Sequence, residues 1–294
     1  MTPFLTLTRR SITERPVMSR LLAGAAVLSL LLLFQASPAY GQGSESPQTV
    51  FKPAISRLWI NTYGNIQLTD RWFWVAQTHF RFKQNESMPF VGQFAQLYNR
   101  HALQYRVSKK LNISLGGVLR FNRNTNAPPQ DGSRTTVPEW RIWHQYKFAM
   151  PFPRLMVYHR LRIEHRWNRG FSEGSEFTFR NRWRYMFNVK IPINKQKLTT
   201  GAFYISPEAE LIMQNGKSVG GSPMEDLRLH TSFGYIVSPR LIVATGFMYS
   251  LGQERPVGIE YNQKATIRLH VYFSPDLRKA KKRFPPFQLL HFTD

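Results

Sequence analysis

The stretch that decides the fold is 155-LMVYHRLRIEHRW-167, in which apolar and polar residues alternate. Its apolar residues, spaced mostly by two or four, are Leu155, Val157, Leu161, Ile163 and Trp167. Its charged residues in the complementary positions are Arg160, Arg162, Glu164 and Arg166. Because successive side chains of a β-strand point to opposite sides, the stretch predicts a strand with one apolar and one charged face.

The same alternation recurs along the chain, most clearly in Trp72–Lys83, Phe177–Lys190 and Glu260–Phe273. It predicts eleven segments, at 56–68, 72–84, 93–107, 111–123, 137–149, 155–169, 176–190, 197–212, 225–237, 240–253 and 260–273. Tight turns alternate with longer links rich in Gly, Pro, Asn and Ser, such as 85–92 and 124–136. Short turns at one rim and long loops at the other are typical of transmembrane barrels.

Strand length separates a membrane barrel from a soluble sandwich or lipocalin-like domain. Soluble strands average about 5–6 residues, whereas tilted membrane-spanning strands need about 9–11. The predicted segments reach a dozen or more residues, and a soluble core would have to bury too many of the 22 Phe, 12 Tyr and 7 Trp. We therefore predict an all-β protein, a transmembrane up-and-down antiparallel β-barrel.

Single-chain bacterial barrels have even strand numbers and both termini in the periplasm. We expect about 12 strands, with Val50–Arg57 as the source of a twelfth, and 10 as the other even count. Aromatic residues near strand ends are expected to form interfacial girdles. These are Trp72, Trp74, Trp140, Trp167, Tyr249 and Tyr272.

The N-terminus has the pattern of an export signal. Leu21–Phe34 is an uncharged apolar run that follows four arginines and precedes small residues ending at Gly41. The run is shorter than the roughly 20 residues of a spanning helix, so we predict cleavage after Gly41, with Met1 or Met18 as the start. The expected organisation is a signal peptide at 1–41, a periplasmic segment at 42–54, an outer-membrane barrel at 55–273 and a basic periplasmic tail at 274–294.

The chain carries 40 Lys and Arg against 17 Asp and Glu and contains no cysteine. The absence of cysteine excludes disulfides, Cys-ligated metal sites and a cysteine nucleophile. Residues 1–41 hold four Arg and one Glu, so the exported part keeps a formal charge of about +20. Export argues against nucleic acid as the partner of this charge and favours lipid headgroups or a cationic lumen.

Several segments together resemble the domain of unknown function 2490 family. They are Trp59, Leu68-Thr69-Asp70-Arg71-Trp72, the run Arg160–Arg166, and Arg180-Asn181-Arg182-Trp183-Arg184-Tyr185. The resemblance covers most of 55–273 and implies an exported outer-membrane β-barrel of Gram-negative bacteria. It implies no catalytic or ligand residue. Barrels commonly end at an aromatic residue, and Phe273 fits that position although 21 residues follow it.

The polar strand faces are expected to line a cationic lumen. Seventeen cations fall on these faces against five carboxylates, Glu139, Glu164, Glu208, Glu210 and Asp226. The candidate anion-binding cations are Arg81, Arg160, Arg162, Arg166, Arg180, Arg182, Arg184 and Arg268. Two interpretations stay open, a structural lumen filled by ion pairs and a porin-like lumen that conducts or binds an anionic small solute.

An enzymatic alternative rests on His230 and Ser232, which lie two residues apart on one strand face. They resemble the His-x-Ser pair of outer-membrane lipid hydrolases, in which His is the base for a Ser nucleophile. The third member is missing, and the predicted phase turns both residues away from lipid. We therefore expect a non-enzyme in the outer membrane, with no metal and no cofactor. Its expected partners are membrane lipids, lipopolysaccharide and the barrel-assembly machinery.

Overall fold

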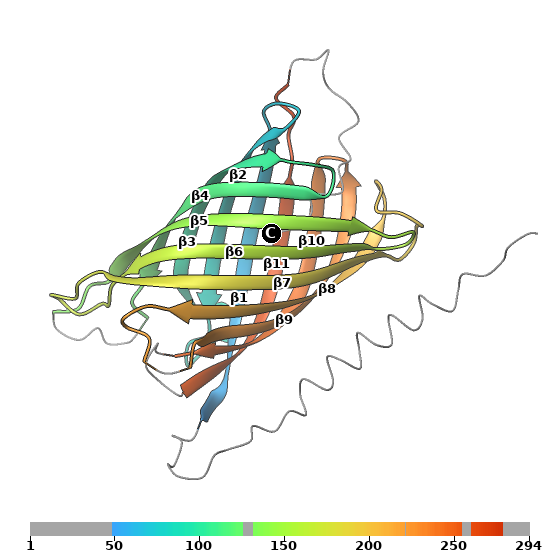
Figure 1. Cartoon of the computed structure of the whole chain (residues 1–294). Helices are drawn as coiled ribbons and strands as arrows, with labels where there is room; N and C mark the ends of the chain where they lie inside the picture. Colours follow the sequence, from blue (N-terminus) through green and yellow to red (C-terminus); the bar gives the residue numbers. More distant parts are fainter. Residues whose placement is uncertain (1–48, 126–131, 221, 255–259, 279–294) are drawn as a thin grey trace, which may run out of the picture. The chain divides into compact units, whose positions relative to one another are not determined.

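The computed structural model describes residues 49–125, 132–220, 222–254 and 260–278, and these form a closed barrel of eleven strands (Figure 1). The strands are β1 (Val50–Gln67), β2 (Trp72–Lys83), β3 (Gln93–Arg106), β4 (Leu111–Arg123), β5 (Thr136–Pro151), β6 (Met156–Asn168), β7 (Thr178–Pro192), β8 (Phe203–Asn215), β9 (Met224–Ser238), β10 (Leu241–Gln253) and β11 (Glu260–Phe273). Each strand pairs with its neighbours in sequence, and β1 pairs with β11 to close the barrel. The all-β barrel prediction is confirmed.

The prediction of twelve strands is wrong for the described residues. The eleven segments seen in the sequence are the eleven strands, and the stretch proposed as a twelfth is the first part of β1. The barrel thus begins at Val50 rather than at residue 55. An odd number is accommodated because β1 and β11 run parallel, while every other pair is antiparallel.

The two rims of the barrel differ in their connections. We call turn rim the end that carries residues 68–71, 107–110, 152–155, 193–202 and 239–240. We call loop rim the end that carries the described residues 84–92, 124–125, 132–135, 169–177, 216–220, 222–223 and 254. Val50 is the register partner of Glu260 at the loop rim, and Phe273 is the partner of Gly64 toward the turn rim. The described chain therefore enters the barrel at one rim and leaves it at the other.

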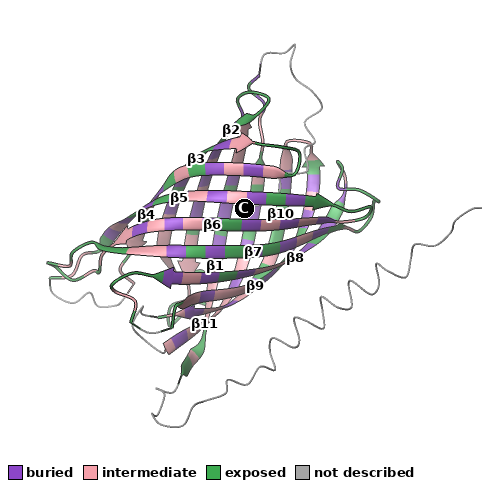
Figure 2. Ribbon diagram, viewed as in Figure 1, coloured by how far each residue is buried: buried purple, intermediate pink, exposed green. Residues whose placement is uncertain are grey.

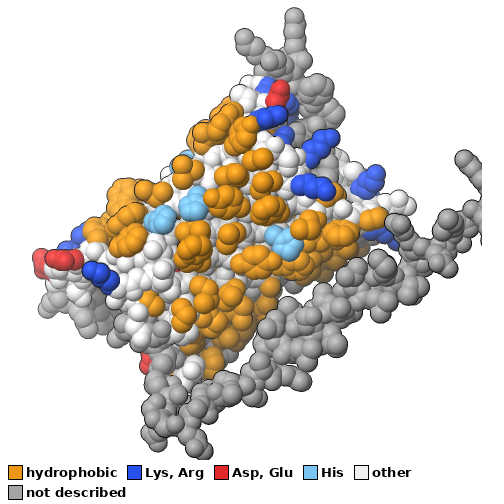
Figure 3. Space-filling view, in the orientation of Figure 1, with side chains coloured by type: hydrophobic (Ala, Val, Ile, Leu, Met, Phe, Trp, Pro, Cys, Tyr) orange, Lys and Arg blue, Asp and Glu red, His pale blue; other side chains and the backbone are white. Residues whose placement is uncertain are grey.

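Burial alternates along the strands with a period of two (Figure 2). In β6, Arg160, Arg162, Glu164 and Arg166 are buried, whereas Leu161 is exposed and Ile163 is partly exposed. Exposed apolar side chains cover the outer surface over the middle of the strands (Figure 3). The face assignment predicted from the sequence of this strand is correct.

An apolar cluster fills the interior near the turn rim. Its buried members are Ala149, Met156, Tyr158, Leu198, Ala202, Tyr204, Ile236 and Ile242. Leu198 and Ala202 belong to the connection between β7 and β8, so this connection folds into the mouth of the barrel. Tyr158 and Ala202 are 0% exposed. The apolar cluster thus shields the lumen from solvent at the turn rim.

The chain continues beyond β11 along the turn rim. Asp276 forms a parallel bridge with Gln67, whose backbone N–H donates to Pro275 and whose carbonyl accepts from Leu277. Arg278 bonds Asp276 at 2.8 Å and Asp70 at 2.7 Å, which holds the segment against the first turn. The predicted signal peptide and the rest of the basic tail lie outside the described residues. The described residues contain no helix that is long and apolar enough to span a membrane.

Candidate functional site

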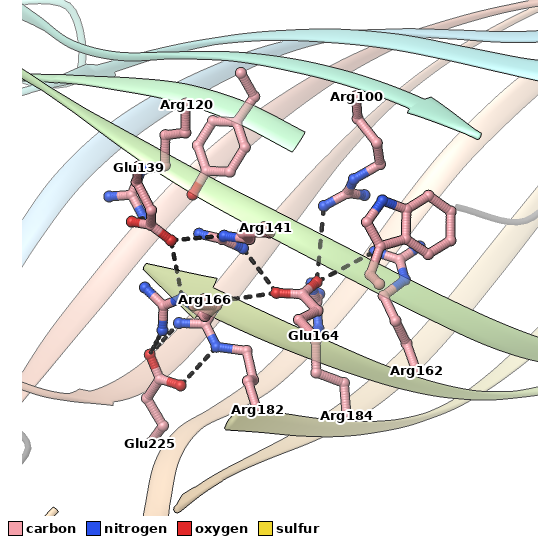
Figure 4. Close-up of polar contacts among 12 residues, drawn as sticks. Arg100, Arg120, Glu139, Arg141, Arg162, Glu164, Arg166, Arg182, Arg184 and Glu225 are labelled. Atoms are coloured by element: carbon pink, nitrogen blue, oxygen red, sulfur yellow. Dashed lines mark hydrogen bonds and ion pairs between the residues drawn. The ribbon is translucent and has the colours of Figure 1, made fainter. Parts of the chain in front are cut away.

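Many charged side chains of the strands point into the barrel, as contacts between strands that are not neighbours show. Arg100 of β3 lies 3.9 Å from Glu164 of β6, and Arg160 of β6 lies 2.6 Å from Glu210 of β8. Contacts of this kind can form only through the interior. We call the resulting cluster the arginine–glutamate network, and Figure 4 shows its part around Glu139, Glu164 and Glu225. Its members are Glu139, Glu164, Glu210 and Glu225 with Arg100, Arg120, Arg141, Arg160, Arg162, Arg166, Arg182, Arg184 and Arg228.

Glu164 is the centre of the network and is fully buried. Guanidinium nitrogens surround its carboxylate, from Arg141 at 2.7 Å, Arg184 at 2.9 Å, Arg182 at 3.5 Å, Arg162 at 3.7 Å and Arg100 at 3.9 Å. One negative charge therefore holds five cations in place. Removing one partner of a buried ion pair typically costs about 3–5 kcal/mol, because the remaining charge is left uncompensated.

Glu139 and Glu210 extend the network toward the two rims. Glu139 accepts from Arg141 at 2.6 Å, Arg166 at 2.8 Å and Arg120 at 3.0 Å. Glu210 accepts from Arg160 at 2.6 Å, from two nitrogens of Arg184 at 2.8 and 3.0 Å, and from Arg228 at 3.3 Å. Arg184 bridges Glu164 and Glu210, so the carboxylates belong to one connected unit.

Glu225 belongs to the network although the strand period does not predict it. Asp226, Arg228 and His230 take the inward positions of β9, which would direct Glu225 outward. The register with β8 shifts here, from Ile212 opposite Asp226 to Met213 opposite Met224, so Glu225 is an extra bulged residue. A bulge redirects a side chain, and Glu225 bonds Arg166 at 3.0 Å and also pairs with Arg182.

Aromatic side chains separate and orient the arginines inside the barrel. The guanidinium carbon of Arg81 lies 3.7 Å from the Trp59 ring centroid and 4.1 Å from that of Tyr98, and Arg162 lies 4.8 Å from the Trp143 ring. Arginine stacks readily on aromatic faces. Sequence reasoning assigned aromatic residues only to outer girdles. Trp72, Trp74 and Trp140 are exposed as expected, but Tyr272 stacks on Tyr63 within the lumen.

The eight candidate cations all lie on the inward face, with different partners. Arg160, Arg162, Arg166, Arg182 and Arg184 are network members. Arg268 lies 3.9 Å from Glu208 and contacts His230 and Tyr63, each at 3.3 Å. Arg180 bonds Gln214 and Asn168, and Arg81 bonds Gln96 and Tyr98.

His230 and Ser232 are both buried inside the barrel, as their predicted phase required. His230 contacts Arg268 through Nδ1 and faces Glu208, whose carboxylate lies 3.9 Å away. Same-face neighbours on one strand are separated by about 7 Å along the chain. Ser232 accordingly lies beside His230 on the inward face of β9. Ser232 faces the lumen, whereas His230 also lines a pocket that outward side chains such as Leu229 and Phe247 share.

Potential metal ligands do not gather in the described part of the chain. No group of three or more His, Asp or Glu residues there is arranged to hold a metal ion. His79 bonds Asn61 at 2.7 Å, His159 bonds Tyr185 at 2.7 Å, and His165 bonds Asn181 at 2.6 Å. Each of these histidines thus has a local hydrogen-bonding partner.

The fold and the interior together define a closed β-barrel with an apolar exterior and a charged, largely side-chain-filled interior. The family described as "Protein of unknown function (DUF2490)" matches residues 56–260. The chain belongs to this family, which confirms the resemblance seen in the sequence. A search of curated proteins yields no significant match.

Proposed function

We propose that the protein is an outer-membrane β-barrel of structural type, with a cationic lumen closed by its own side chains. The observation that carries this proposal is the arrangement of the two faces. Outward side chains such as Trp74, Tyr185 and Phe247 are 42%, 47% and 53% exposed, whereas most charged residues of the arginine–glutamate network are buried. A soluble barrel would have the reverse arrangement, and lipid is the solvent that suits these outer faces.

Barrel closure supports a membrane location in a second way. In hydrocarbon, each unpaired backbone polar group costs several kcal/mol, so a sheet must have no free edge. Pairing of β1 with β11 removes that edge. Insertion would require the barrel-assembly machinery, and the exposed apolar belt would contact membrane lipids and lipopolysaccharide.

The filled interior favours the structural interpretation over a freely conducting pore. The arginine–glutamate network occupies the middle of the lumen, and the apolar cluster occupies the turn rim. The small cavity between Trp59, His79 and Arg268 measures only about 50 Å³, room for very few water molecules. The excess of arginines over glutamates in the network supports a lumen that attracts anions.

Membrane insertion can be tested by cell fractionation and electrophoresis. The folded protein should fractionate with the outer membrane and should resist SDS until boiled, with a change of apparent mass afterwards. Coincident bands before and after boiling, or a helical circular dichroism spectrum, would refute the barrel in the membrane.

Closure of the lumen is tested in planar bilayers under a salt gradient. Heat-modifiable protein should insert without producing a steady conductance. A steady chloride-selective current would overturn the closed lumen and favour the anion-favouring pore. A potassium-selective current would contradict the cationic lumen as well.

A further inference from the structure

A cavity of about 450 Å³ lies inside the barrel at the loop rim, and we call it the basic vestibule. Arg57 and Trp59 of β1, Arg81 of β2, Arg120 of β4, Arg166 of β6 and Arg180 of β7 are among its lining residues. Lys83, Arg123 and Arg169 also line it, whereas Glu139 and Glu254 are its only carboxylates among the described residues. Arg123 is exposed, which places the vestibule in contact with the outside of the barrel.

The basic vestibule has an excess of hydrogen-bond donors. Among the described residues, the side chain of Arg57 has no hydrogen bond and no ion pair within 4 Å. The Nε atoms of Arg57, Arg81 and Arg180 and the indole Nε1 of Trp59 are buried without an acceptor. Guanidinium and indole groups donate hydrogen bonds and accept none. Cationic donors therefore outnumber the carboxylate acceptors among the described residues that line the basic vestibule.

Several of these donors are held in place by contacts that leave part of each guanidinium group unused. Arg81 is stacked between Trp59 and Tyr98, and its Nη1 donates to the Tyr98 hydroxyl at 2.9 Å. Arg120 and Arg166 are anchored on Glu139 at 3.0 and 2.8 Å. A site whose donors are fixed beforehand loses little side-chain entropy when a ligand binds.

We propose that the basic vestibule binds a small polyvalent oxyanion, a molecule with two or more phosphate or carboxylate groups. Arginine recognises both groups by paired hydrogen bonds, and the cavity is in the size range of small-molecule sites. Several cations around one cavity suit more than one anionic group. The site deepens the proposed function, because it gives the cationic lumen a ligand that enters from the loop rim.

Calorimetry on the folded full chain in detergent tests the site with two probes, tripolyphosphate and citrate. Binding of either should saturate in the presence of 0.15 M chloride, a condition under which nonspecific surface attraction is screened beyond about 8 Å. Preference for tripolyphosphate would identify phosphate as the recognised group, and preference for citrate would identify carboxylate. No saturable binding of either probe would overturn the proposal.

Matched variants separate a built site from general positive charge. The double variant Arg57→Gln and Arg81→Gln should weaken binding at least tenfold. The double variant Lys109→Gln and Lys110→Gln removes the same charge at the turn rim and should bind as the wild type does. Equal weakening in both would mean long-range attraction without a site, and would refute the proposal.

Three further measurements separate loss of the site from loss of the fold. Each variant is first checked for heat-modifiable mobility, which reports the barrel of the proposed function independently of binding. Arg81→Lys keeps the charge but loses the planar stacking on Trp59, and it should bind more weakly than the wild type. Ligand-induced fluorescence change should be reduced in Trp59→Phe, and an unchanged signal would place the anion elsewhere.

Discussion

Gly64 of β1 is the register partner of Phe273 of β11, and the two strands run in the same direction. This parallel closure fixes where the ends of the described chain emerge. Val50 begins β1 at the loop rim, whereas the residues after Phe273 continue along the turn rim beside Gln67. If the barrel spans the membrane, the two ends of the described chain lie on opposite sides of it.

The absence of cysteine makes this topology easy to test by labelling. Single cysteines are introduced as Val50→Cys and Leu277→Cys, with Glu173→Cys and Lys109→Cys as markers of the loop rim and the turn rim. A membrane-impermeant maleimide added to cells should label Val50→Cys together with Glu173→Cys. Leu277→Cys should be labelled only under the conditions that also label Lys109→Cys. Labelling of Val50→Cys and Leu277→Cys from the same side would contradict the parallel closure.

The apolar outer face predicts a depth-dependent cost for a charge. Ile163→Arg, near the middle of β6, should destabilise the barrel by about 2–4 kcal/mol if it meets the bilayer midplane. Val157→Arg lies on the same face near the end of the strand and should cost only about 0–1 kcal/mol. Unfolding by denaturant in lipid bilayers measures both. Equal costs would mean that the outer face of β6 does not lie in hydrocarbon.

The period-two pattern predicted the strands and, in β6, the face of each side chain. It did so because alternation in a strand is a local property, and Arg160 to Arg166 follow it without interruption. Strand pairing between the ends of the chain has no local signal, so the parallel contact of β1 with β11 and the odd strand number were missed. The rule that barrels have even strand numbers suggested a twelfth strand where β1 simply begins earlier.

The sequence pattern did not predict several residues of the site, for three different physical reasons. Glu225 sits at a bulge, and a single extra residue reverses the alternation that assigned its face. Arg57 has few alternating neighbours in sequence, yet it shares the inward face with Trp59 in the folded barrel. The aromatic residues Tyr98 and Trp143 have no sequence mark that distinguishes a lumen position from a girdle position.

If His230 and Ser232 were catalytic, replacing Ser232 would abolish lipid hydrolysis. A structural barrel has no such activity to lose. Ser232→Ala should leave phospholipid hydrolysis by the purified protein at the background level seen with wild type, because Ser232 lies within the lumen beside His230. His230→Gln provides the matched test of the base. Release of fatty acid from phospholipid vesicles is the measurement. Hydrolysis by wild type that disappears in both variants would establish the enzyme.

The ion pair between Asp276 and Arg278, in the segment after β11, should make the stability of the wild type relative to Asp276→Asn depend on pH. Hydrogen bonds from the Arg278 guanidinium hold the pKa of the Asp276 carboxyl below its usual value. A lowered pKa in the folded state stabilises the fold above the unfolded pKa of about 3.9, and this contribution is lost as pH falls through the folded value. Asp276→Asn should therefore lower the melting temperature at pH 7, and the difference from wild type should vanish in strong acid.

The control for this prediction is Glu86→Gln, which removes one exposed carboxylate from the link after β2. It should melt like the wild type throughout the pH range. A difference for Asp276→Asn that is the same at pH 7 and in strong acid would show that the ion pair with Arg278 is not its cause.

The position of Glu164 among five guanidinium groups gives the strongest prediction for stability. Glu164→Gln keeps the size of the side chain but removes the negative charge and introduces an N–H₂ donor facing other donors. The cost should be about 3–5 kcal/mol in the free energy of unfolding, since the surrounding cations lose their shared partner. Glu173→Gln, exposed in the link after β6, should change stability by no more than about 0.5 kcal/mol.

A double-mutant cycle with Arg162 identifies the cause of that loss. Arg162 lies 3.7 Å from Glu164 and otherwise bonds the amide of Gln145. With Glu164 present, Arg162→Gln removes a favourable charge pair. In the Glu164→Gln background the same change relieves repulsion among the remaining arginines, so the double variant should be less destabilised than the sum of the single variants. Denaturant unfolding followed by tryptophan fluorescence gives the three values. Strict additivity would mean that Glu164 contributes through packing alone and that its charge does not hold the arginines together.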